Sequence, residues 1–349
     1  MFLSIHTAIF RMLSSILRRG LFVAPLIALA GCDTVVMNPS GDIAAQQAHL
    51  VTVSTLLMLL IIVPVIALTI LFAWRYRQSN TAAKYEPDWD HSTRLELVIW
   101  GAPLLIIIVL GLLTWISTHT LDPYRPLQRI DAQRPVSASV KPLEVQVVAL
   151  DWKWLFIYPE QGIATVNELV APVDVPVRFK ITASTVMNSF YIPALAGQIY
   201  AMPGMQTTLN AVINKPGVYE GFSANYSGAG FSDMRFKFHG TSQEDFDKWV
   251  QRTKSSTVQL DRADYTALEK PSIRDQVRHY GSVEADLFDA IVNRCVDRNA
   301  TCMKDMMAED AARATRNATS ASLAAERTER RLAQATTGEV CLTPETKKN

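Results

Sequence analysis

Two long segments without charged side chains constrain the fold of this chain more than any other feature of the sequence. Leu50–Trp74 comprises 25 residues and Leu97–Thr118 comprises 22. A helix needs about 20 apolar residues to cross the hydrocarbon core of a membrane, and two buried helices of such length rarely occur in one soluble domain. We therefore predict transmembrane helices at 50–74 and 97–118. The hydrophobic fraction of 49% fits such a chain if the remaining residues form an extramembrane domain.

Positive charges are concentrated on one side of the two predicted spans. The connecting loop, 75–96, contains four Lys or Arg residues, whereas 33–49 contains none. Because positively charged loops stay in the cytoplasm, this loop is predicted to be cytoplasmic and both ends of the mature chain periplasmic. The formal net charge of the whole chain is only +1, which argues against a nucleic-acid partner.

The first 31 residues have the features of a secretory signal. Three arginines lie within the first 20 residues, and an apolar stretch at 21–30 leads into Leu29-Ala-Gly-Cys32. Leu-Ala-Gly-Cys resembles the bacterial lipobox, whose cysteine becomes the lipidated first residue, and Asp33 resembles the signal that retains lipoproteins in the inner membrane. We therefore predict a signal peptide at 1–31, lipidation of Cys32 and a periplasmic segment at 32–49.

The segment after the second span changes from proline-rich to strand-like. Residues 119–142 contain four prolines and are predicted to be an extended linker. Within 143–240, β-branched and aromatic residues alternate with polar ones in short runs separated by Gly, Pro and Asn. Roughly 100 residues of short strands predict an antiparallel β-sandwich or barrel. The predicted strands are 145–148, 152–158, 175–181, 207–213 and 234–238.

The last part of the chain is predicted to be mainly helical. A capping box at Thr241-Ser-Gln-Glu244 would open a helix over 244–252, and apolar residues at four-residue spacing predict a second helix over 283–295. We therefore expect a C-terminal helical arm at 241–295. Residues 296–349 are expected to be a variable, partly disordered tail, and two interpretations stay open beyond Met303: a solvated helix or a partly disordered arm.

The four cysteines do not form a CxxC pair, so neither a zinc site nor thioredoxin-like chemistry is indicated. Cys295 and Cys302 would face an oxidising compartment, where a disulfide is conceivable. On one continuous helix they would lie roughly 10 Å apart, too far for a bridge, but a helix break at 299–301 would permit it. Both possibilities stay open, and Cys341 has no assigned role.

The loop Gly221–Met234 has the spacing of a copper-binding loop but different side chains. Ser223 and Ser227 are four residues apart, Phe231 follows four later and Met234 three after that. With Cys at both serine positions and His at 231, the spacing would suit a clustered copper site. Copper favours thiolate, imidazole and thioether ligands, whereas hydroxyl and phenyl groups do not suit it.

Together with four other segments, this loop resembles subunit II of the haem–copper respiratory oxidases. The resemblance implies a two-helix transmembrane hairpin, a periplasmic cupredoxin-like Greek-key β-barrel and a C-terminal helical arm. The other matching segments are Glu96–Pro103, Asp151–Pro159, Val186–Pro193 and Ile199–Gly204.

The resemblance also identifies positions where this sequence departs from the family. In cytochrome c oxidases this domain holds a dinuclear copper centre, CuA, through two cysteines, two histidines, a methionine and a glutamate carbonyl. Only the methionine is retained, so the site is expected to hold no metal. The matching positions are Ser223, Ser227, Asn188, Phe231, Met234 and, for the glutamate, Asn225. This pattern is similar to the quinol-oxidising branch, the cytochrome bo-type ubiquinol oxidases, whose subunit II lacks CuA.

Membership of that branch implies a subunit without a catalytic residue or redox centre of its own, within a proton-pumping enzyme that oxidises ubiquinol and reduces oxygen to water. Haem b, haem o or a, copper and ubiquinol would be bound by subunit I. The implied partners are subunit I, subunits III and IV and inner-membrane lipids, but not cytochrome c. None of the six histidines lies within a predicted span, which excludes bis-histidine haem ligation there. They are scattered along the chain: His6, His49, His91, His119, His239 and His279.

Three further residues have roles implied by the resemblance. Glu96 matches a family glutamate at the mouth of a proton channel, although it could equally be an ordinary interfacial carboxylate. Trp152 matches the tryptophan through which electrons leave cytochrome c, but without CuA we expect Trp152 and Trp154 to pack against the barrel or subunit I. Two alternatives were weighed: a cytochrome c oxidase subunit with intact CuA, disfavoured by the missing ligands, and a free-standing lipoprotein binding module.

Overall fold

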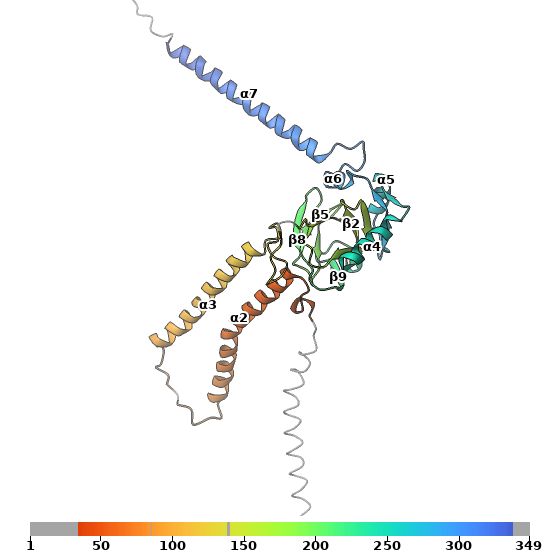
Figure 1. The fold of residues 1–349 in the computed structure, drawn as a ribbon. Coiled ribbons are helices and arrows are strands. Elements are labelled where there is room, and N and C mark those ends of the chain that lie inside the picture. Colours follow the sequence, from red (N-terminus) through yellow and green to blue (C-terminus); the bar gives the residue numbers. More distant parts are fainter. Residues whose placement is uncertain (1–33, 85, 138–139, 338–349) are drawn as a thin grey trace, which may run out of the picture.

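A computed structural model describes residues 34–84, 86–137 and 140–337. It shows a helical hairpin, a two-sheet β domain and a C-terminal helical region (Figure 1), so the predicted fold class is confirmed. The predictions for the signal peptide at 1–31, for lipidation of Cys32 and for Cys341 concern residues outside the described ranges.

The hairpin consists of α2 (Asp42–Arg75) and α3 (Thr93–Thr120), and it extends away from the β domain (Figure 1). Both helices are long and apolar enough to cross a membrane. Each is longer than the predicted span, because polar residues continue the helix beyond the hydrocarbon-length segment; α2 begins eight residues before Leu50. A single short 3-10 turn, η1 (Val35–Met37), precedes α2.

The β domain contains two sheets. The six-stranded sheet has the order β12-β3-β2-β1-β5-β8, and the five-stranded sheet has the order β4-β10-β9-β6-β7. The strands of the first sheet are β1 (Leu143–Leu150), β2 (Lys153–Tyr158), β3 (Ile163–Val166), β5 (Val177–Ala183), β8 (Thr207–Ala211) and β12 (Arg278–Tyr280). Those of the second are β4 (Glu168–Pro172), β6 (Asn188–Tyr191), β7 (Ile199–Ala201), β9 (Gly217–Ser223) and β10 (Arg235–Thr241).

The expectation of a purely antiparallel domain is wrong. β1 pairs with β5 in parallel, and β10 pairs with β4 in parallel, whereas the other pairings in these two sheets are antiparallel. The reason is the path of the chain: between β1 and β5 it passes through β4 in the opposite sheet. A strand that returns after such a crossover can lie beside its earlier neighbour in the same direction.

The main core lies between the sheets and is rich in aromatic side chains. Phe236 stacks on Phe190 with 5.5 Å between ring centroids, and Trp154 meets both rings edge-on. A second apolar cluster covers the outer face of the six-stranded sheet. Tyr265 and Ile291 of the C-terminal region contribute to it, together with other residues of that region. Both faces of β2 are therefore buried, which explains why all six of its residues are inaccessible.

Residues 241–295 form the expected C-terminal helical region, which also contains short strands. Two short strands interrupt its helices, and β12 joins the edge of the six-stranded sheet. The predicted helix at 283–295 is shorter, because residues 282–283 pair with β11 instead. The elements are α4 (Gln243–Lys254), β11 (Gln259–Leu260), α5 (Arg262–Glu269), β13 (Ser282–Val283) and α6 (Leu287–Val292).

The N-cap of this helix lies one residue later than the predicted capping box places it. Ser242 is the N-cap of α4, and its hydroxyl oxygen accepts a hydrogen bond from the Asp245 backbone N–H at 3.1 Å. Thr241 is instead the last residue of β10, where it continues the pairing with β4.

A disulfide joins Cys295 to Cys302, with 4.9 Å between their Cα atoms. The bridge is possible because α6 ends at Val292, so the two cysteines do not lie on one continuous helix. Of the two interpretations of the tail, the structure has the helix: α7 (Met303–Thr337) runs for 35 residues and leads away from the β domain (Figure 1). Its side chains are almost entirely exposed over 306–333.

Candidate functional site

Three of the positions that match copper ligands meet at one end of the five-stranded sheet. Asn188 begins β6, Ser223 ends β9, and Met234 immediately precedes β10. β9 runs antiparallel to both β6 and β10: Ser223 pairs with Phe190, two residues after Asn188, and the preceding Phe222 pairs with Arg235, the residue after Met234. The Ser223 backbone N–H donates to the Met234 carbonyl at 3.2 Å, which closes this end of the sheet.

Side-chain hydrogen bonds connect the polar residues at this place. The Ser223 hydroxyl lies 3.1 Å from Asn188 Oδ1 and 3.2 Å from the Asn225 carbonyl, either of which can accept its proton. Asn188 Nδ2 donates to the Val186 carbonyl and Asn225 Nδ2 to the Met187 carbonyl. Asn188 and Ser223 are 1% and 3% exposed. Buried polar groups of this kind need partners, and here the site residues and the adjacent backbone supply them.

The other matching positions are held by different contacts. Met234 is fully buried and belongs to the main core. Phe231 begins the 3-10 turn η2 (Phe231–Asp233), and its ring packs against Tyr226 with 5.6 Å between centroids. The Ser227 hydroxyl is buried and has no hydrogen-bond partner among the described residues, whereas its carbonyl accepts from Trp152.

Trp152 covers the Gly221–Met234 loop. Its Nε1 donates to the Ser227 carbonyl at 3.1 Å. The indole lies so close to Gly230 that a Cβ added there would be 2.4 Å from Trp152 Cδ2, so this residue must be glycine for the ring to lie flat on the loop. Trp154 is fully buried between Phe190 and Phe236. Of the two expected packing partners, the barrel and subunit I, the structure shows both tryptophans packed on the barrel.

The residues at this end of the sheet do not fit a dinuclear copper centre. Its positions present hydroxyl, amide and phenyl groups and one thioether, whereas copper sites use thiolate and imidazole. Among the described residues, no group of three or more His, Cys, Asp or Glu side chains is arranged to hold a metal ion.

Glu96 lies at the opposite end of the hairpin from the β domain, in the first turn of α3. Its side chain is 47% exposed, and Oε1 lies 2.7 Å from His91 Nδ1. A carboxylate is favoured near a helix N-terminus because of the unpaired backbone N–H groups there. The position is compatible with both interpretations of Glu96, since an exposed carboxylate can collect protons or simply face the interface.

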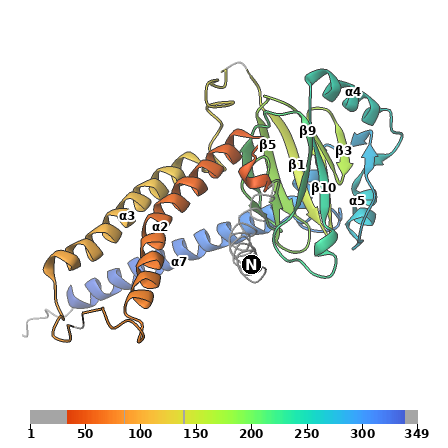
Figure 2. The ribbon, with the colours of Figure 1, turned by 90° about the horizontal axis from the view of Figure 1, so that it is seen from below.

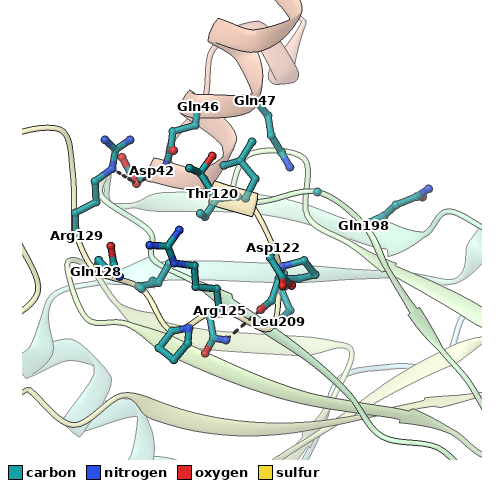
Figure 3. A pocket seen from close by; sticks show the side chains of 17 residues that line it. Asp42, Gln46, Gln47, Thr120, Asp122, Arg125, Gln128, Arg129, Gln198 and Leu209 are labelled. Carbon is teal, nitrogen blue, oxygen red and sulfur yellow. Dashed lines mark hydrogen bonds and ion pairs between the residues drawn. The ribbon is translucent and has the colours of Figure 1, made fainter. Parts of the chain in front are cut away.

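The structure also contains a cavity of about 290 Å³, lined by both polar and apolar residues, where the hairpin meets the β domain (Figure 3). At its edge, Asp42 is 5% exposed and its Oδ2 accepts from Arg129 Nε at 2.9 Å and Gln46 Nε2 at 2.8 Å. Sequence reasoning missed this cavity. The available signal was Asp42 itself, the one acidic residue between positions 34 and 85.

Two family descriptions match the sequence. Residues 144–240 match "Cytochrome C oxidase subunit II, periplasmic domain", and residues 254–299 match "COX Aromatic Rich Motif". The second match coincides with the segment that covers the outer face of the six-stranded sheet.

Three curated relatives are similar over most of the chain. A "Cytochrome bo(3) ubiquinol oxidase subunit 2" from Pseudomonas putida is 53% identical over 269 residues, which cover 77% of this chain and 83% of the relative. The protein of the same description from Pseudomonas aeruginosa is 50% identical, with coverage of 79% and 81%. A "Ubiquinol oxidase subunit 2" from Acetobacter aceti is 49% identical, with coverage of 81% and 89%.

Proposed function

Because this chain belongs to the ubiquinol oxidase subunit 2 family, we propose that it is a subunit of an inner-membrane complex that oxidises ubiquinol and reduces oxygen to water. One observation carries the choice of donor. Where the cytochrome c branch has copper ligands, this chain has serine and asparagine side chains bonded to each other and to the backbone. These side chains do not supply the copper ligands that an electron relay from a soluble donor would need.

The chemistry of the donor agrees with this assignment. Cytochrome c is water-soluble and carries one electron, so its oxidase needs a docking face and a relay on the periplasmic side. Ubiquinol is dissolved in the membrane, and its electrons can enter the complex there. Haem b, haem o or a, copper and the ubiquinol site would then all belong to subunit I. This chain would stabilise subunit I and shape the periplasmic face, together with subunits III and IV.

The donor is tested by purifying the intact complex and measuring oxygen consumption with ubiquinol and, separately, with reduced cytochrome c. Activity with ubiquinol and none with cytochrome c is expected. The reverse result would reject the proposal, as would a purified chain that lacks a haem-containing partner. Mass spectrometry of the same preparation identifies which of subunits I, III and IV accompany the chain.

We propose further that Asn188, Ser223, Asn225, Ser227, Phe231 and Met234 occupy the positions of lost copper ligands. The combined variant Asn188→His, Ser223→Cys, Ser227→Cys and Phe231→His restores the side-chain types that copper prefers. It should bind copper and absorb in the near infrared. The matched control carries Ser223→Ala and Ser227→Ala in place of the two cysteines, which removes both thiolates, and should do neither. Equal copper content in both variants would contradict the assignment.

Glu96 is proposed to mark a proton entrance on the cytoplasmic side, supported by its exposure and its contact with His91. Glu96→Gln removes the titratable group and should slow ubiquinol-driven proton uptake in reconstituted vesicles. Glu86→Gln, in the same loop and similarly exposed, is the matched control. If both variants pump protons at the same rate, Glu96 is an ordinary interfacial carboxylate.

Removal of residues 1–31 and lipidation of Cys32 are also proposed, on the basis of the Leu-Ala-Gly-Cys sequence. Mass spectrometry of the mature chain should show an N-terminal cysteine with acyl groups. Cys32→Ser should abolish both the added mass and the cleavage. An unmodified, cleaved N-terminus would reject the lipid anchor without affecting the oxidase assignment.

A further inference from the structure

Two adjoining cavities lie where α2 and α3 meet the β domain. The first, of about 290 Å³, lies beneath the linker and beside β8 (Figure 3). The second, of about 440 Å³, lies between the two helices just below it. The cavities share several lining residues, so they adjoin each other where the hairpin meets the β domain. The shared residues are Asp42, Gln46, Thr120, Leu121 and Arg129.

The first cavity lies at the depth of lipid headgroups. The uncharged segments end at Leu50 on α2 and at Thr118 on α3. The headgroup layer on each side of a bilayer is about 5–8 Å thick, which corresponds to roughly three to five helical residues. Gln46 on α2 lies four residues before Leu50, and Thr120, the last residue of α3, lies two residues after Thr118, so these ends of both helices fall within that layer.

The charged residues that line this cavity differ in how many of their hydrogen-bonding groups already have a partner within the protein. Asp42 and Arg129 are paired with each other, at 2.9 Å. The exposed Arg125 side chain, by contrast, donates one hydrogen bond among the described residues, from Nη1 to the His119 carbonyl at 3.3 Å, so its other guanidinium N–H groups can meet a ligand. The exposed Asp122 carboxylate accepts one hydrogen bond, from the Tyr124 backbone N–H. The cavity therefore offers one available cation and one available anion.

The second cavity supplies an apolar continuation. Its walls include Leu50, Leu113 and Ile116, which lie on the facing sides of α2 and α3 at the start of the hydrocarbon-length segments. The lining thus changes from charged to apolar along the direction in which the hairpin leaves the β domain. A phospholipid has the same order of chemistry, with a charged headgroup above an acyl chain.

We propose that this junction binds one zwitterionic phospholipid of the leaflet next to the β domain. The phosphate would lie at the Arg125 guanidinium, whose planar array of donors suits phosphate oxygens. The headgroup ammonium would lie at Asp122, and one acyl chain would occupy the space between α2 and α3. Equal numbers of available positive and negative groups favour a zwitterionic headgroup, such as phosphatidylethanolamine, over a purely anionic one. An uncharged quinol would leave both charges unpaired.

The bound lipid would connect the hairpin to the β domain, because its headgroup contacts the linker while its chain contacts both helices. This binding does not depend on which donor supplies electrons. Its failure would therefore leave the oxidase assignment intact, and an oxidase with a different donor would still bind the lipid.

Native mass spectrometry of the intact complex, released from nanodiscs containing phosphatidylethanolamine and phosphatidylglycerol, tests the proposal. Arg125→Gln should reduce retained phosphatidylethanolamine about tenfold, the effect of losing one hydrogen bond to a charged group. Arg316→Gln, on the exposed α7 helix, is the matched control and should retain lipid as the unmodified complex does. Equal lipid retention by Arg125→Gln and Arg316→Gln would overturn the proposal.

A second variant tests the headgroup. Asp122→Asn removes the anion but keeps the side-chain shape, so it should shift the preference from phosphatidylethanolamine toward phosphatidylglycerol. An unchanged preference would reject the role of Asp122. A structure of the complex in which a polypeptide segment of another subunit or a quinol fills the cavity would reject the lipid. Displacement of the lipid by millimolar inorganic phosphate alone would likewise show a simple anion site.

Discussion

Replacement of Gly221 by alanine is expected to destabilise the β domain by about 3 kcal/mol. A Cβ added at Gly221 would lie 2.0 Å from Cζ of Phe236 and 2.4 and 2.5 Å from two further ring atoms. Carbon atoms normally pack at about 3.5–4.0 Å, so the ring would have to move by about 1.5 Å or more. Phe236 is 2% exposed and stacked on Phe190, and a close-packed interior offers no space for that movement.

The estimate follows from the cost of overpacking. Extra methylene groups in a well-packed core cost about 1–3 kcal/mol, and a contact this short places Gly221→Ala at the upper end. Urea unfolding of a fragment covering residues 140–337, which contains all the buried residues of both apolar clusters, measures the change. Gly197→Ala is the control, because the three atoms nearest its added Cβ belong to Gln47 on α2, which the fragment lacks.

A second substitution tests the stated cause. Phe236→Leu shortens the obstructing side chain, so Gly221→Ala combined with Phe236→Leu should cost at least about 1 kcal/mol less than the sum of the two single changes. Strict additivity would show that the ring is not responsible. A Gly221→Ala fragment within about 0.5 kcal/mol of the unmodified one would refute the reasoning altogether.

Three further changes probe the C-terminal region and its contact with Lys153 of β2. Ser242→Ala removes the cap that accepts from Asp245 N–H and should cost about 1 kcal/mol in the same urea assay; an unchanged midpoint would contradict that role. Replacing Cys295 and Cys302 by serine removes a bridge of sequence separation 7, and a loss of about 2 kcal/mol relative to the oxidised fragment is expected. Burial lowers the pKa of Lys153 from its usual 10.5, so the unfolded chain binds this proton more readily, and stability should rise with pH over the range just below 10.5. Lys153→Met should flatten that rise in urea titrations at several pH values, and an undiminished slope would show that another group causes it.

Local patterns predicted the larger elements of this fold. The uncharged lengths of 50–74 and 97–118 predicted the two spans, since the hydrocarbon thickness sets the length of a spanning helix. Five strands of the β domain were predicted from β-branched and aromatic residues. Shorter strands such as β6 and β7, with four and three residues, were missed, because so few residues show no clear period. β2 did not show the burial pattern of a half-exposed strand, because a second apolar cluster covers its outer face.

The candidate site was predicted in part. The spacing of Ser223 and Ser227 indicated a former metal loop, since ligand spacing is a local property of the chain. The hydrogen bond that joins Ser223 to Asn188, 35 residues apart, depends on how β6 and β9 pair. The cover that Trp152 provides over Gly230 likewise depends on the approach of two separate turns.

The sequence by itself determined the membrane spans, the two-part architecture and the lack of cysteine and histidine in the Gly221–Met234 loop, because each follows from the chemistry of neighbouring residues. Only the tertiary structure decided which distant residues share an environment. The Cys295–Cys302 bridge became possible where α6 ends, and the ion pair between buried Asp42 and Arg129 joins residues 87 positions apart. Such contacts arise from chain crossings and from packing between layers, and these are set by the whole fold rather than by any local pattern.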